Sequence, residues 1–292
     1  MVKNKSLGSY AADAAIHLIL FLFAMVTLIP FYSILAGSLA SARENALNPL
    51  LLWPREPTFD SYRYILSTPT MPRALLVTIY ITIVGTTVNI VMTILMAWPL
   101  AHRRIMGRAA IMFYVTFTML FNGGMIPTYL VVRGVGLLNS WAALIIPTAI
   151  NAFNLILMKN FFQEVPASLE ESAKLDGAND LSILIRIVVP LSMPAIATFT
   201  LFYAVAHWNS FMNVLLYIRN SSKWTIQILL RQIVILSQGG MGDSSMMGES
   251  FLIPPQGVKM AAIIFSTFPI LCVYPFLQKY FIKGVMAGSI KG

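Results

Sequence analysis

Long apolar runs separated by short polar segments are the dominant pattern along the chain. A helix that crosses the hydrocarbon core of a bilayer needs about 17–25 mostly apolar residues. Runs of this kind predict transmembrane helices at residues 16–39, 74–100, 109–130, 141–158, 191–216 and 259–281. The pattern therefore predicts an all-α polytopic membrane protein with six spans, in which residues 1–292 form a single transmembrane domain.

Composition supports the assignment to the membrane. Hydrophobic residues make up 58% of the chain and charged residues only 11%, far below the quarter that is typical of soluble domains. The net charge of +9 does not indicate nucleic-acid binding, because the basic residues are scattered at span ends, where lipid headgroups attract them. The bilayer is the expected partner.

Six spans place both termini on the same side of the membrane. Arg103, Arg104 and Arg108 form the densest basic cluster, and short loops rich in Lys and Arg stay in the cytoplasm. We therefore expect both termini and the loop at 159–190 to be cytoplasmic in a bacterial inner membrane. The segments 41–73 and 219–256 are then external; the second contains an amphipathic stretch at 224–236.

The polar segment 159–190 lies between the fourth and fifth predicted spans. Seven charged residues rule out a location in the bilayer core: Glu164, Glu170, Glu171, Lys174, Asp176, Asp180 and Arg186. Ser168 and Glu171 have the spacing of a capping box, so we predict a short helix that begins there and ends near Asp176. Gly177 is suited to a left-handed helix end. Asn179 or Asp180 would cap a second helix that runs toward Pro190.

This segment resembles the EAA loop of ABC-importer permeases. The resemblance rests on Glu171-Ser172-Ala173, Gly177 four residues later, then Ile187 and Pro190; Ser172 replaces the first alanine of the family pattern. In the family this loop is the coupling helix, which docks into a groove on the ATP-binding subunit. The small apolar face of Leu169, Ala173 and Leu175 fits such helix-in-groove recognition.

The carboxyl-terminal residues resemble the tail of maltose-type sugar permeases, which reaches into the ATPase dimer interface. The similar residues are Gln278-Lys279-Tyr280-Phe281, Gly284, Gly288 and Lys291-Gly292. With the two motifs together, the family implies these ATPase-coupling residues: Leu169, Glu170, Glu171, Ser172, Ala173, Asp176, Gly177, Pro190, Gly288 and Lys291.

The resemblance, which also includes Trp208-Asn209-x-Phe211, implies a type I ABC-importer permease with six helices. It is most similar to permeases for oligosaccharides, including alginate- or pectin-derived sugars. It implies as partners a homologous second permease, a dimer of ATP-binding subunits that hold ATP and Mg, and an extracytoplasmic solute-binding protein. No cofactor is expected in this chain.

Polar residues inside apolar runs are the candidate substrate contacts, because they tend to face a bundle interior or a cavity. Amide and aromatic side chains suit sugars. The candidates are Asn122, Asn151, Asn154, His207, Trp208, Asn209 and Asn213. An alternative for each is a hydrogen bond that only holds helices together.

Other function classes have less support from the residues. The chain has no P-loop motif, so energy would come from a separate subunit, and no nucleophile elbow or metal motif indicates an enzyme. Cys272 is the only cysteine, and the irregular methionines at 241–247 do not indicate a metal site. A secondary transporter or channel for another polar solute remains the alternative, although all the acidic residues fall in loops.

Overall fold

The computed structural model describes residues 7–48, 50–102, 105–237 and 256–289; their regular secondary structure is entirely helical, without a strand. The all-α prediction is therefore confirmed. The chain divides into two compact units, residues 1–69 with 230–268 and residues 70–229 with 269–292. Helices α14 (Ile226–Ser237) and α15 (Gln256–Ser289) belong partly to each.

The first unit contains α1 (Leu7–Ser38), α2 (Ala42–Leu47) and α3 (Asp60–Ser67). Ser41 caps α2 through its side chain, and Asn45 donates to the carbonyl of Gly37 at 2.9 Å. Gly257 lies so close to α3 that a Cβ there would be 2.8 Å from Ser61 Oγ. Small residues thus allow the start of α15 to pack against this unit, as in many membrane helix contacts.

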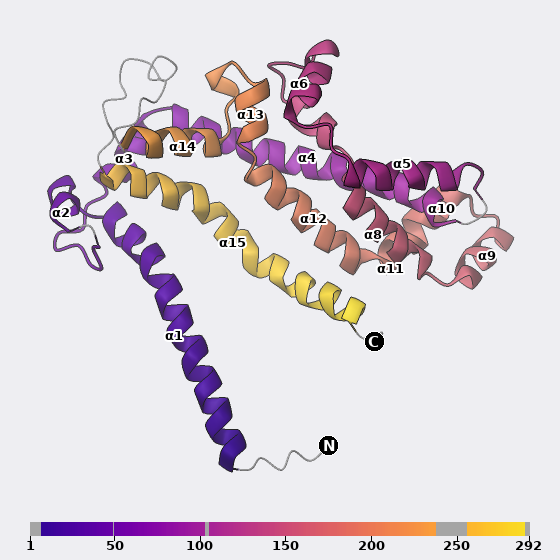
Figure 1. Ribbon diagram of the computed structural model, residues 1–292, viewed down its shortest axis with the longest axis horizontal. Helices are drawn as coiled ribbons and strands as arrows, with labels where there is room; N and C mark the ends of the chain where they lie inside the picture. Colours follow the sequence, from indigo (N-terminus) through magenta and orange to yellow (C-terminus); the bar gives the residue numbers. More distant parts are fainter. Residues whose placement is uncertain (1–6, 49, 103–104, 238–255, 290–292) are drawn as a thin grey trace. The chain divides into compact units, whose positions relative to one another are not determined.

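The second unit is built around α4 (Thr70–Ala101), which packs against α12 and α8 (Figure 1). Its other elements are α5 (Arg108–Leu120), α6 (Met125–Gly134), α7 (Ala142–Ile145), η1 (Ile146–Thr148), α8 (Ala152–Gln163), α9 (Ala167–Leu175), α10 (Asp180–Ile183), the π-helical η2 (Leu184–Val188), α11 (Val189–Leu191), α12 (Met193–Trp208), α13 (Met212–Tyr217) and η3 (Ser221–Lys223).

A buried apolar core lies where α4, α8 and α12 meet. Trp98, Met158, Phe162 and Phe199 are among its members, and all are at most 8% exposed. Val188 brings the π-helical segment into the same core. The core therefore fixes both ends of the polar segment between α8 and α12.

Several predicted spans differ from the helices in the structure. Within the described residues, three helical segments are long and apolar enough to cross a membrane, namely Ala12–Ser38, Thr70–Ala101 and Gln256–Val273. Up to five crossings result if each of two bent helix pairs counts as one. The pairs are Ala142–Thr148 with Ala152–Gln163, bent by 55°, and Asp180–Leu191 with Met193–Trp208, bent by 84°.

Prolines and glycines explain these breaks. The predicted span at 109–130, whose sequence is interrupted by Asn122-Gly123-Gly124 and Pro127, consists of two shorter helices, α5 and α6. Gly124 between them has φ of +84°. Pro190 and Pro194 flank the 84° bend. Proline favours a bend at this point because it lacks the N–H that continues the hydrogen bonding of a helix. The run at 191–216 likewise ends its first helix at Trp208 and resumes in α13. The helix α15 extends to Ser289, beyond the predicted end at 281.

Candidate functional site

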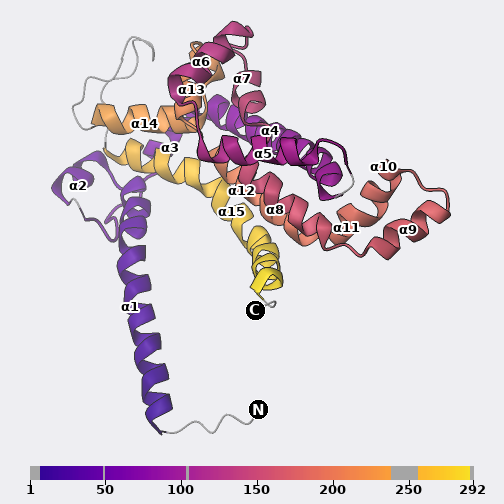
Figure 2. The same ribbon diagram turned by 45° about the vertical axis from the view of Figure 1, so that its right-hand side comes forward.

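The helix pair α9 and α10 forms a compact hairpin at the Ala101 end of α4. The loop with α13 and η3 lies at the other end, where Ile226 N donates to Thr78 Oγ1 at 2.8 Å (Figure 1, Figure 2). Thr78 and Ala101 are 23 residues apart on α4 (101 − 78), which corresponds to about 35 Å along a helix. The α9–α10 hairpin and the loop with α13 and η3 are thus separated by roughly the thickness of a bilayer core.

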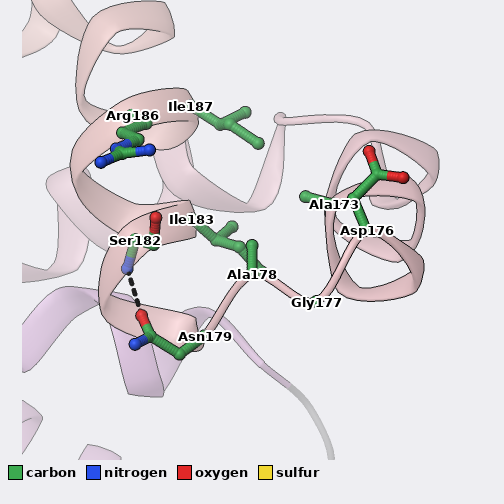
Figure 3. A pocket seen from close by; sticks show the side chains of 9 residues that line it. All are labelled: Ala173, Asp176, Gly177, Ala178, Asn179, Ser182, Ile183, Arg186 and Ile187. Atoms are coloured by element: carbon green, nitrogen blue, oxygen red, sulfur yellow. Dashed lines mark hydrogen bonds between the residues drawn. The ribbon is translucent and has the colours of Figure 1, made fainter.

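The turn between α9 and α10 closes through two backbone hydrogen bonds. Gly177 has φ of +83°, which confirms the predicted left-handed conformation. Its N–H donates to the carbonyl of Lys174 at 3.0 Å, and the N–H of Ala178 donates to that of Ala173 at 2.9 Å. This is the Schellman pattern of helix termination. Asn179 then caps α10, because its Oδ1 accepts from Ser182 N at 2.8 Å (Figure 3).

The predicted capping box is wrong. The helix α9 begins at Ala167 with Pro166 in the capping position, and no side chain caps it. Ser168 lies inside the helix because the fixed φ of proline, here −60°, already sets the chain direction at its start. Glu171 therefore has no capping role and is exposed to solvent.

The hairpin encloses a hollow of about 460 Å³ between α9 and the helices that follow. Ala173 on α9 points towards Ile183 and Ile187 on the opposite wall (Figure 3). Two leucines of α9 are exposed to solvent: Leu169 is 43% exposed and Leu175 is 89% exposed. Exposed leucines on a short helix can bind a partner's groove.

The remaining predicted coupling residues lie in or near this hairpin, except those at the carboxyl terminus. Ser172 is exposed on α9, Asp176 ends that helix, and Pro190 lies in α11. Gly288 is part of the last turn of α15, and Lys291 lies outside the described residues.

The sequence analysis missed one residue of this region. His102 lies directly after α4, and its Nε2 is 2.9 Å from Glu170 Oε2 on α9. Its Nδ1 is 3.0 Å from the carbonyl oxygen of Trp98. Gln163 adds a second link from this segment to α4, because its Nε2 donates to the carbonyl of Ala101 at 2.9 Å. A contact between residues 68 positions apart has no local sequence signal.

Two of the predicted substrate residues share a cavity near the middle of the second unit. Asn122 and Asn151 both line a cavity of about 570 Å³, together with Thr118, Thr148 and Phe153. Asn122 Oδ1 accepts from Gly124 N at 2.8 Å, and Asn151 Oδ1 accepts from Asn154 N at 3.0 Å as the cap of α8. Because the turn or the cap holds the side-chain oxygen of each asparagine, it also fixes the orientation of the side-chain NH₂ group.

His207 belongs to a buried polar network beside this cavity. Its Nε2 is 2.6 Å from Asn89 Oδ1, and Asn89 Nδ2 donates to the carbonyl of Thr148. Tyr203 adds a hydrogen bond of 2.9 Å with Thr93 on α4 and accepts from Asn151 N at 3.2 Å. The network joins α4, α8 and α12. His207 is 6% exposed, so in this structure it holds helices together.

The other predicted substrate residues are not gathered at one place. Trp208 is 8% exposed and Asn154 is 6% exposed, so both are buried. Asn209 is exposed and donates to the carbonyl of Val205 at 3.0 Å, while Asn213 is half-buried on α13. A role in the substrate pathway stays a prediction for all seven residues.

Comparison with known proteins is decisive for the family. The family described as "Binding-protein-dependent transport system inner membrane component" matches residues 7–287. The chain belongs to this family. It is therefore an inner-membrane transport permease, and the family is one of transporters, not of enzymes.

Relatives that are named as sugar permeases match almost the whole chain. The chain is 53% identical to the polygalacturonan/rhamnogalacturonan transport system permease of Bacillus subtilis, over 96% of this chain and 98% of the relative. It is 28% identical to the trehalose/maltose transport system permease of Thermococcus litoralis, over 93% and 94%. The recognition of the chain as similar to permeases of sugar ABC importers is thus confirmed.

A solved structure agrees with this assignment. The chain is 34% identical to a chain in the crystal structure of a bacterial ABC transporter involved in the import of the acidic polysaccharide alginate. The two share a TM-score of 0.85, with 94% of this chain and 98% of the other covered. The predicted ABC-importer permease fold is therefore confirmed.

Proposed function

We propose that this permease works in an ATP-driven importer for acidic oligosaccharides of the pectin type. It would pair with a homologous permease, receive the sugar from an extracytoplasmic binding protein, and take its energy from a dimer of ATP-binding subunits. The observation that carries the ATP-driven part of this proposal is the exposed helix α9, which is held in a hairpin at one end of α4 and presents Leu169 and Leu175. Such a surface suits an ATPase groove.

Coupling through α9 requires a stiff connection to the membrane helices. The hairpin is closed by the Gly177 turn, capped by Asn179 and continuous with the core through Val188. A displacement of α9 by closing ATPases would therefore be transmitted to α12 through packed side chains. Packed interfaces of this kind shift between discrete arrangements, which is how access could alternate between the two faces.

The charge distribution supports an acidic sugar. Residues 133–140 and 209–226 carry Arg133, Arg219 and Lys223 but no acidic residue. The two loops are joined: Lys223 Nζ donates to the carbonyl of Asn139 at 2.6 Å, and Asn220 N donates to Asn139 Oδ1 at 3.0 Å. The acids Glu164, Glu170, Glu171, Asp176 and Asp180 are all at the opposite end of α4. A region whose charged side chains are all positive attracts ligands of negative charge.

The cavity with Asn122 and Asn151 would then be part of the sugar pathway. Its described lining carries amides, hydroxyls and an aromatic ring but no charged side chain, a combination that binds sugar hydroxyls and faces. The proposed orientation places both termini and α9 in the cytoplasm, and the loops at 133–140 and 209–226 outside. The basic loops would attract the carboxylates of the sugar. Because the cavity lining carries no charged side chain, it would bind the sugar weakly enough for release.

Reconstituted proteoliposomes test this proposal. The complete importer should take up oligogalacturonate only with ATP and binding protein present. The matched control is the methyl-esterified oligogalacturonate of the same length, which lacks the negative charge. Uptake of the acid at least tenfold above the ester supports the acidic class. Equal uptake of acid, ester and a malto-oligosaccharide would refute it, and uptake without ATP would favour a secondary transporter.

A further inference from the structure

The break between η1 and α8 frees two backbone groups from helical hydrogen bonding. In a continuous helix, the N–H of Asn151 would donate to the carbonyl of Pro147, and the carbonyl of Thr148 would accept from the N–H of Ala152. Here one helix ends at Thr148 and the next begins at Ala152. Backbone groups away from water need other partners, and this need is strictest inside a bilayer.

Side chains of α12 and α4 provide these partners. The hydroxyl of Tyr203 on α12 accepts from Asn151 N at 3.2 Å. Asn89 on α4 donates from Nδ2 to the carbonyl of Thr148, and its Oδ1 is 2.6 Å from His207 Nε2. Because an amide oxygen only accepts, His207 is the donor in this contact. Tyr203 and His207 are four positions apart, so they lie on one face of α12, and this face holds the break.

The same break forms part of the wall of the cavity of about 570 Å³. Thr148 and Asn151 both line it, and so does Asn122 from the break between α5 and α6. Irregular backbone at membrane depth occurs where it is buried in protein or borders a cavity. The position of this wall therefore depends on where Tyr203 holds Asn151.

The helix α12 is also the continuation of the coupling hairpin. The π-helical η2 and α11 connect α10 to α12 (Figure 1), and Val188 of η2 and Phe199 of α12 belong to one core. Tyr203 is 5% exposed, and its hydroxyl is also 2.9 Å from Thr93 Oγ1 on α4. A movement of α12 must either carry Asn151 with it or break the hydrogen bond from Asn151 N to Tyr203.

We propose that Tyr203 is a positioning residue that conveys movements of α12 to the cavity wall at residues 148–151. The inference rests on the proposed function, in which the coupling hairpin displaces α12 and the sugar passes through the cavity. The alternative is that the hydroxyl only stabilises the helix bundle. Tyr203→Phe separates the two roles, because it removes the hydroxyl and keeps the buried ring.

The first measurement is the amount of oligogalacturonate transported per ATP hydrolysed in proteoliposomes that contain the complete importer and its binding protein. Tyr203→Phe should assemble in normal yield, and its ratio should fall about fivefold, the lower end of typical coupling between sites. Tyr62→Phe is the matched control. The Tyr62 hydroxyl is 2.8 Å from Ser38 Oγ, so this variant also loses a hydrogen bond between two helices, but Tyr62 does not line the cavity. Its ratio should be unchanged.

The second measurement follows the cavity itself. Thr118 lies on α5 and lines the cavity, so Thr118→Cys places a thiol there without altering the wall at 148–151. Cys272→Ser removes the exposed native cysteine. The rate of labelling by a water-soluble methanethiosulfonate should differ between the resting complex and the complex trapped with ATP and vanadate. Addition of Tyr203→Phe should abolish this difference.

Four results would overturn the role of Tyr203: an unchanged transport ratio in Tyr203→Phe, an equal loss in Tyr62→Phe, a labelling difference that survives Tyr203→Phe, or no labelling difference in an importer that is active. Failure of Tyr203→Phe to assemble would also contradict it, because the hydroxyl would then be needed for folding. If the unmodified importer hydrolyses ATP but takes up no oligogalacturonate, the proposed substrate is wrong, and the labelling comparison still decides the role of Tyr203.

Discussion

Substitution of Gly177 by alanine isolates the contribution of backbone conformation to the coupling helix. Gly177 has φ of +83°, and a Cβ added there would meet no atom within 4 Å. The substitution therefore creates no clash, and its cost is that of placing a residue with a Cβ in the left-handed region, about 1–2 kcal/mol. The loss falls on the two hydrogen bonds that close α9, from Gly177 to Lys174 and from Ala178 to Ala173.

Hydrogen exchange measures this loss directly. A cost of 1–2 kcal/mol corresponds to an opening equilibrium raised about 5- to 30-fold. We expect amides in a peptide covering residues 170–182 to exchange faster by that factor in Gly177→Ala. Gly177→Asn should lose less, because asparagine tolerates the left-handed conformation better than alanine.

Gly134→Ala is the matched control. Gly134 lies at the end of α6 with no positive φ, and a Cβ there also meets nothing within 4 Å. Alanine is favoured over glycine in a helix by about 0.5–1 kcal/mol, so this variant should be neutral or slightly more protected. If Gly177→Ala exchanges no faster than the unmodified chain, the turn does not control the stability of α9 and the reasoning is wrong.

Three further predictions follow from the site. Gly85→Ala places a Cβ 2.6 Å from the ring of His207, and such overpacking should cost about 1–3 kcal/mol, seen as a lower melting temperature of the purified chain in detergent; an unchanged value would contradict the packing. Glu171→Lys reverses an exposed charge without removing a helix cap, so complex yield should stay normal while substrate-stimulated ATP hydrolysis falls; normal stimulation would exclude a coupling role. Trp208 is buried, so Trp208→Ala tests whether its role is packing or substrate contact. A fall in complex yield that accounts for all the lost uptake refutes the substrate role, whereas lost uptake at full complex yield supports it.

Features that depend on neighbouring residues could be predicted from the sequence. Membrane insertion follows from the length of the apolar runs, and the left-handed turn at Gly177 follows from the residue itself. The cap at Asn179 is local for the same reason, because its side chain bonds to a backbone group three positions away. The predicted cap at Ser168 failed although its spacing was correct, since Pro166 already determined where α9 begins.

Features that depend on distant residues were decided by the tertiary structure alone. The sequence gives no reason to pair His102 with Glu170, because the contact needs the end of α4 to meet α9 across 68 positions. The same holds for Asn122 and Asn151, which the fold brings to one cavity, and for His207, which it directs onto Asn89, 118 positions away. An apolar run shows that a segment can cross the membrane, but which polar groups meet depends on how the helices bend and pack. The 55° bend before α8 and the 84° bend after Pro190 are part of that tertiary arrangement.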